Sequence, residues 1–159
     1  MAVITIGAGA ADYNTYRSAA TNVDRTNPAN GSGSIDTVEM WFYVQNGANV
    51  KVGTFSGSGT SWDDRDYETI GTVTAGAKRT FTGLDITVQD NDIIGEYHSS
   101  GLIEANSSGG SGVGIYANDA FGSGAQEYTI EVNYKISLYG TGETVSVGAR
   151  LLSLTGVGN

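Results

Sequence analysis

The chain has 159 residues, of which eight are basic and seventeen are acidic, so its formal charge is −9. A nucleic-acid-binding protein needs a basic stripe to displace counterions from phosphate, and these Lys and Arg residues are scattered, so we expect no nucleic-acid partner. The same charge disfavours docking on an anionic membrane surface, and no apolar run approaches the roughly 20 residues of a membrane span, so we expect no membrane association.

The composition is typical of a single all-β domain without disulfides. There is no cysteine, which excludes disulfides, thiolate zinc sites and a cysteine nucleophile. The N-terminus lacks the basic and apolar regions of a secretory signal peptide, so we expect synthesis in the cytoplasm. The 24 glycines are about twice the usual share of roughly 7% and cluster between alternating segments, as in the turns of all-β proteins.

In the first half of the chain, apolar residues that recur with a period of two predict short strands. The predicted ranges are 3–6, 19–23, 37–44, 50–55 and 68–74. Residues 10–18 lack such a pattern and are predicted to form a loop. In the strand 37–44, one face is apolar and is expected to point into the core; it carries Val38, Met40, Phe42 and Val44.

The opposite face of the strand 37–44 carries two aromatic residues, Trp41 and Tyr43. Aromatic side chains on an outer face can fill a subunit contact or stack on sugar rings. If both faces of the sheet are covered, the pair belongs to the core instead. All three interpretations stay open from the sequence.

An acidic cluster follows in a predicted Gly-rich loop that begins at residue 56. Asp63, Asp64 and Asp66 place three carboxylates within four residues, and such groups repel one another unless a cation neutralises them. Carboxylate oxygens are the ligands that calcium prefers, so this cluster is a candidate calcium site. Arg65 within the cluster is the alternative source of positive charge. We expect no other cofactor.

A second acidic stretch, Asp90-Asn91-Asp92, separates the predicted strands 78–88 and 92–98. It lacks the Gly and Glu offsets of an EF-hand, whereas Asp and Asn readily bond to their own backbone in tight turns. We therefore interpret it as a turn. His98, at the end of the following strand, is predicted to lie at the surface or in an interface.

Strict alternation from Glu127 to Tyr139 predicts a long antiparallel strand with one buried face, and residues 113–116 predict a shorter one. About eight short strands with Gly-rich loops indicate a single antiparallel β-sandwich that is jelly-roll-like and spans residues 1–142.

After Gly140-Thr141-Gly142 the sequence turns apolar again, and we separate residues 143–159 as a C-terminal tail. An apolar tail rarely stays in water, so we predict that it adds a strand or forms a subunit contact. The side chains expected in this contact are Val145, Val147, Leu151, Leu152 and Leu154.

No catalytic constellation emerges from the sequence. Five glutamates lie on or beside strand-like segments, but nothing pairs two of them across a cleft as glycoside hydrolysis requires; they are Glu39, Glu96, Glu104, Glu127 and Glu131. His98 is the only histidine, and no Gly-x-Ser-x-Gly turn precedes a helix. We therefore expect that the protein is not an enzyme.

The stretches "RTFTGLDITVQDNDIIGEYHSSGLIEANSSGGSGVGIY" and "EYTIEVNYKISLYGTG" contain an apolar strand, an acidic tight turn and "IIGEY". This pattern resembles small jelly-roll β-sandwich proteins of tailed phages and environmental viral sequences. Asn91-Asp92 stands where Gly-Asp is commoner in that pattern, so no functional residue is carried over.

The resemblance implies a virion structural protein, such as a capsid decoration, head-fibre or tail-associated module on the virion surface. Its implied partners are other copies of the chain, with a trimer favoured, and other virion proteins. The alternative function is a carbohydrate-binding module or a receptor-reading fibre tip, with a glycan as partner.

Overall fold

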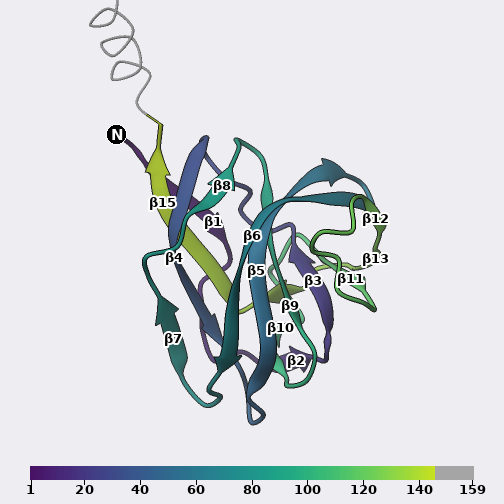
Figure 1. The fold of residues 1–159 in the computed structure, drawn as a ribbon. Coiled ribbons are helices and arrows are strands. Elements are labelled where there is room, and N and C mark those ends of the chain that lie inside the picture. Colours follow the sequence, from purple (N-terminus) through teal and green to yellow (C-terminus); the bar gives the residue numbers. More distant parts are fainter. Residues whose placement is uncertain (146–159) are drawn as a thin grey trace, which may run out of the picture.

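A computed structural model of the chain describes residues 1–145, which form antiparallel strands and no helix (Figure 1). The prediction of an all-β, sandwich-like fold is confirmed. Fifteen strands are present in this range, several of them only two or three residues long, where the sequence patterns suggest about eight. The strands are β1 Val3–Gly7, β2 Thr15–Arg17, β3 Ala20–Asp24, β4 Gly33–Trp41, β5 Gly47–Ser58, β6 Ser61–Val73, β7 Lys78–Phe81, β8 Ile86–Val88, β9 Ile93–His98, β10 Ile103–Asn106, β11 Val113–Tyr116, β12 Gln126–Glu127, β13 Thr129–Glu131, β14 Lys135–Ile136 and β15 Leu138–Thr144.

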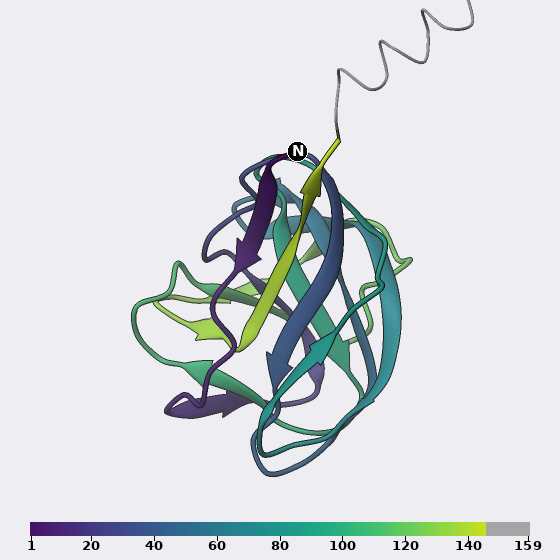
Figure 2. The ribbon, with the colours of Figure 1, turned by 90° about the vertical axis from the view of Figure 1, so that its left-hand side faces the viewer.

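The strands form two large sheets and one small one. A five-stranded sheet has the order β1-β15-β4-β7, with β8 also paired to β4, and it faces the viewer in Figure 2. A seven-stranded sheet has the order β12-β6-β5-β9-β3-β11-β13. The small sheet, β14-β10-β2, places β2 at the end of the molecule opposite the N-terminus (Figures 1 and 2).

The main core lies between the sheets and contains side chains from all three. Ile4 and Met40 come from the five-stranded sheet, Val52 from the seven-stranded sheet and Ile103 from the small one, and each is fully buried. A second cluster around Phe55, Trp62, Phe121 and Tyr128 packs on the seven-stranded sheet. The described residues contain no helix long and apolar enough to cross a membrane.

The predicted inward face of the strand 37–44 is confirmed for three residues and is wrong for the fourth. Val38, Met40 and Phe42 are fully buried, whereas Val44 is 66% exposed. The strand β4 ends at Trp41, because the chain turns after Phe42 to begin β5. Beyond Phe42, the alternation of apolar residues therefore does not indicate which side chains are buried.

The prediction of one long strand from Glu127 to Tyr139 is wrong. Its first part supplies β12 and β13 to the seven-stranded sheet, while β14 joins the small sheet and β15 joins the five-stranded one. The chain leaves the first sheet at a turn in which Val132 is 68% exposed and Asn133 adopts a φ of 67°. Asn tolerates this left-handed conformation better than most residues do, so the crossing falls there.

The predicted boundary after Gly142 falls inside a strand. The strand β15 continues to Thr144 between β1 and β4, with Glu143 opposite Val3 and Thr144 opposite Gly33. A side chain at Gly142 would overlap the backbone of Ser34, so this glycine permits close approach of two strands. Val145 is 54% exposed, and its N–H donates to the carbonyl of Ser32. The other predicted tail contacts, Val147, Leu151, Leu152 and Leu154, lie outside the described residues.

The interpretation of Asp90-Asn91-Asp92 as a turn is confirmed. Asn91 has a φ of 72°, and the N–H of Asp92 donates to the carbonyl of Gln89 at 3.0 Å. The carboxylate of Asp92 accepts from the N–H of Gln89 at 2.8 Å and from the guanidinium of Arg65, and it is almost fully buried. This ion pair joins the turn to β6.

Candidate ligand-binding site

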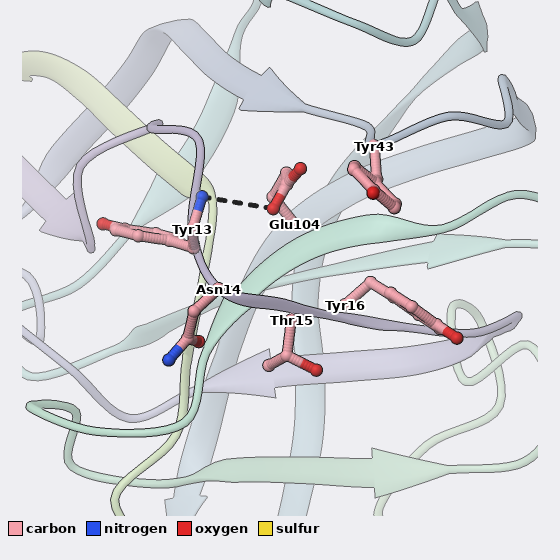
Figure 3. Close-up of a pocket in the computed structure, with 6 residues that line it drawn as sticks. All are labelled: Tyr13, Asn14, Thr15, Tyr16, Tyr43 and Glu104. Carbon is pink, nitrogen blue, oxygen red and sulfur yellow. Dashed lines mark hydrogen bonds between the residues drawn. The ribbon is translucent and has the colours of Figure 1, made fainter.

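A small pocket of about 180 Å³ opens where β2, β10 and the segment after β4 meet (Figure 3). Three of its six lining residues are tyrosines, and one is a buried glutamate. The lining consists of Tyr13, Asn14, Thr15, Tyr16, Tyr43 and Glu104.

The two outer tyrosines of the pocket form a stacked aromatic wall. The rings of Tyr16 and Tyr43 lie 6.0 Å apart between centroids, with an interplanar angle of 11°. Tyr43 is held in place by its N–H, which donates to the carbonyl of Leu102 at 2.7 Å. Tyr16 is fixed because β2 pairs with β10, which sets Tyr16 opposite Glu104. Both residues remain more than 40% exposed and can therefore contact a ligand.

Glu104 is the one charged side chain that lines the pocket. Its side chain lies between Tyr13 and Tyr43 in Figure 3, although the residue is only 1% exposed. One carboxylate oxygen, Oε2, accepts from the N–H of Tyr13 at 3.1 Å, while Oε1 has no hydrogen-bond partner in the described part of the chain. Buried polar atoms are normally paired, so an unpaired carboxylate oxygen beside a pocket indicates a place for a ligand donor.

The pKa of Glu104 is raised above its ordinary value. Burial is the main cause; the Tyr13 N–H partly opposes it, and the negative charge of Asp12 adds to it.

The loop that carries Tyr13 is tied to the sandwich. The hydroxyl of the buried Ser137 donates to the carbonyl of Ala11 at 2.8 Å and accepts from the Ala11 N–H at 2.6 Å. The hydroxyl of Tyr13 donates to the carbonyl of Gly9 at 2.6 Å. A loop held in this way loses little conformational freedom when a ligand binds.

The structure places one of the two predicted aromatic residues in this pocket. Tyr43 forms part of its wall, whereas the half-buried Trp41 lies opposite Lys78 on β7 and does not line the pocket. Tyr13 and Tyr16 were not predicted, because residues 10–18 show no strand period. Glu104 was predicted only as one of five glutamates without a partner.

The predicted acidic cluster is located on a strand and not in a loop. Asp63, Asp64 and Asp66 belong to β6, and two of them bind backbone N–H groups in different segments. Asp64 accepts from Gly122 at 3.0 Å, and Asp66 accepts from Thr87 at 2.7 Å. Within residues 1–145, no three His, Asp or Glu side chains converge as a metal-binding group. The structure thus gives the calcium prediction no set of converging ligands.

The prediction that His98 lies at the surface is wrong, because this residue is fully buried. Its Nδ1 lies 2.8 Å from Glu96 Oε2, and Glu96 Oε1 accepts from the amide of Asn22 at 2.7 Å. Burial alone would lower the pKa of His98, but the charge of Glu96 and its hydrogen bond outweigh this and raise the pKa. The three residues form a polar chain across β3 and β9 inside the sandwich.

Together these features define an all-β sandwich with an aromatic pocket and a polar interior. Comparison of the chain with protein-family models, curated proteins and solved structures gives no match. The resemblance to phage jelly-roll proteins therefore stays a prediction.

Proposed function

We propose that the protein is a carbohydrate-binding module whose ligand site is the pocket between Tyr13, Tyr43 and Glu104. One observation carries the proposal: the unpaired Oε1 of the buried Glu104 lies beside the stacked wall of Tyr16 and Tyr43. The C–H face of a sugar ring packs on an aromatic plane, and a sugar hydroxyl donates to a carboxylate. A glycan supplies both kinds of contact in one ligand.

The size of the pocket agrees with a small sugar ligand. Pockets that enclose drug-sized molecules have volumes of about 300–1,000 Å³. The present pocket, at about 180 Å³, holds at most one sugar unit. Asn14 and Thr15 in its wall add side-chain donors and acceptors that can select among sugar hydroxyls.

Truncation of the aromatic wall is expected to weaken glycan binding. On a glycan array, the wild-type chain should bind at least one carbohydrate, and Tyr43→Ala should lower the affinity about tenfold, the loss typical of a central aromatic contact. Val44→Ala is the matched control, because Val44 is the next residue and is exposed outside the pocket. A chain that binds no carbohydrate, or one in which both variants bind like wild type, contradicts the proposal.

We further propose that the protein is displayed on a virion surface as a homo-oligomer, with a trimer favoured. The sequence resemblance supports this, together with an apolar patch at one end of the sandwich. This end patch consists of Met1, Val3 and Val145, which are 84%, 63% and 54% exposed. The three lie together because Ala2 and Thr144 exchange hydrogen bonds, and the N-terminus and the end of β15 are adjacent in Figures 1 and 2. The apolar C-terminal sequence continues from this patch.

Deletion of residues 146–159 is expected to leave a folded sandwich that assembles more weakly than the full chain. These residues follow β15, so the deletion removes none of the described strands. Light scattering at micromolar concentration measures the assembly, and circular dichroism checks the fold. Val3→Ser should also weaken assembly, whereas Val132→Ser, at an exposed valine outside the end patch, should not. If the truncated chain assembles as tightly as the full one, the tail is not part of the interface.

A further inference from the structure

A second and larger pocket, of about 430 Å³, lies beside the first and shares two of its residues. It is lined by residues 15–20, Asn22, Ile115 and Glu131, so Thr15 and Tyr16 belong to both pockets. Its floor belongs to the seven-stranded sheet, in which Ile115 and Asn22 are direct cross-strand partners. The two pockets thus adjoin at Thr15 and Tyr16 of the short strand β2.

Asn22 presents an unpaired acceptor in the wall of the second pocket. Its Nδ2 donates to Glu96 Oε1 at 2.7 Å, because a carboxylate can only accept from the amide. The other amide atom, Oδ1, is buried and has no partner in the described residues, and the whole side chain is fully buried. Its orientation is fixed by Glu96, which in turn binds His98.

Arg17 presents an unpaired donor in the same wall. Its guanidinium lies 4.0 Å from the ring centroid of Tyr134 and forms an ion pair with Glu131. Its Nε is buried and has no hydrogen-bond partner among residues 1–145. A hydroxyl group both accepts and donates, so a sugar hydroxyl is the kind of group that satisfies Arg17 Nε and Asn22 Oδ1.

The charges around the two pockets argue against an acidic ligand. Glu104 lines the first pocket and Glu131 the second, and the cation of Arg17 is already paired with Glu131. The chain as a whole carries a charge of −9. A carboxylated sugar would meet this negative field without a free cation in either lining, whereas a neutral sugar avoids the repulsion.

We infer that the glycan site extends across Tyr16 into the second pocket and takes a neutral glycan of at least two sugar units. This inference rests on the proposed carbohydrate-binding function. The first pocket holds one unit against Tyr43 and Glu104, and the second holds the next unit through hydroxyl contacts with Asn22 and Arg17.

The test measures binding of the full chain to four neutral monosaccharides and to a disaccharide of each. The probes are glucose, galactose, mannose and N-acetylglucosamine, with cellobiose, β1,4-galactobiose, β1,4-mannobiose and chitobiose, and saturation-transfer NMR with titration gives the affinities. At least one disaccharide should bind about tenfold more tightly than its monosaccharide. Ala19→Trp fills the second pocket from an exposed position in its lining and should abolish this gain without changing monosaccharide affinity. Ala19→Ser is the control and should keep the gain.

The outcomes separate this inference from the proposed function. Equal affinity for every disaccharide and its monosaccharide, or a gain that survives Ala19→Trp, overturns the extended site but leaves the first pocket intact. Lactose and sialyllactose are titrated in the same way, and binding of sialyllactose as tight as that of lactose overturns the preference for neutral glycans. If none of the monosaccharides or disaccharides binds, both the inference and the proposed function fail.

Discussion

Replacing Asp92 with alanine is expected to lower the free energy of unfolding by about 3 kcal/mol, as measured by urea denaturation. The Asp92 side chain is 3% exposed and accepts from Arg65 Nε at 2.5 Å, from Arg65 Nη2 at 3.0 Å and from the Gln89 N–H at 2.8 Å. Its loss leaves the Arg65 guanidinium without these two hydrogen bonds and the Gln89 N–H without its partner. Removal of one member of a buried pair costs about 3–5 kcal/mol. The Arg65 side chain is 25% exposed, so water can solvate part of its charge when Asp92 is removed. We therefore expect a value at the lower end of this range.

Asp90 in the same turn provides a matched control for Asp92. The residue is exposed, and among residues 1–145 its carboxylate accepts a hydrogen bond only from the neighbouring amide of Asn91, at 3.3 Å. Asp90→Ala should change the free energy of unfolding by less than about 0.5 kcal/mol, as is usual for surface positions. If Asp92→Ala lowers the free energy of unfolding no more than Asp90→Ala does, the ion pair of Asp92 with Arg65 does not stabilise the fold.

Local patterns predicted some strands closely but not all. The strands β2 and β10 were not predicted, and the predicted strand 78–88 is wrong, because this range forms two separate strands, β7 and β8. The range 113–116 coincides with β11, and the range 19–23 with β3 to within one residue at each end. Alternation cannot show which sheet a strand joins, because it reports only the two faces of the chain. The segment 127–139 alternates throughout, yet it crosses three sheets by turning at Asn133. Such a crossing is fixed by tertiary pairing and not by local sequence.

The candidate site could be predicted only in part, because its residues meet through long-range pairing. Tyr13 and Glu104 are 91 residues apart in sequence, and the short strands β2 and β10 bring them together. The outward position of Tyr43 was predictable from alternation. Its separation from Trp41 was not, because β4 ends between the two residues. A strand end changes which surface an aromatic side chain reaches.

The polar interior was hidden from the sequence because β3 is covered on both faces. All five of its residues are buried, with Val23 in the aromatic cluster and Asn22 and Asp24 on the opposite face. In the sequence, such a polar face resembles a solvated one. Only the hydrogen bonds of Asn22 and Asp24 distinguish the two cases.

Asp24 is the residue of this interior whose titration should be easiest to detect. Its carboxylate is fully buried and accepts from the N–H of Thr26 and of Ile136, each at 2.9 Å. Burial raises the pKa of Asp24 from its ordinary 3.8 to about 6, although the hydrogen bonds to Ile136 and Thr26 and the charge of Lys135 oppose this. The protonated form is therefore favoured in the folded chain relative to the unfolded one.

The free energy of unfolding should accordingly fall as the pH rises from about 4 to about 6. In this window the folded chain holds a proton on Asp24 that the unfolded chain has released, so raising the pH favours unfolding. A shift from 3.8 to about 6 corresponds to a loss on the order of 3 kcal/mol. The raised pKa of Glu104 also lowers the free energy of unfolding as the pH rises. The raised pKa of His98 extends this decrease above pH 6.5.

Urea unfolding at pH 4, 5, 6 and 7 measures the effect. Asp24→Asn should be less stable than wild type at pH 4, because its amide cannot accept from both N–H groups, and its stability should vary less between pH 4 and 6. A wild-type chain that becomes more stable between pH 4 and 6 would show that Asp24 is ionised at no cost inside the sandwich.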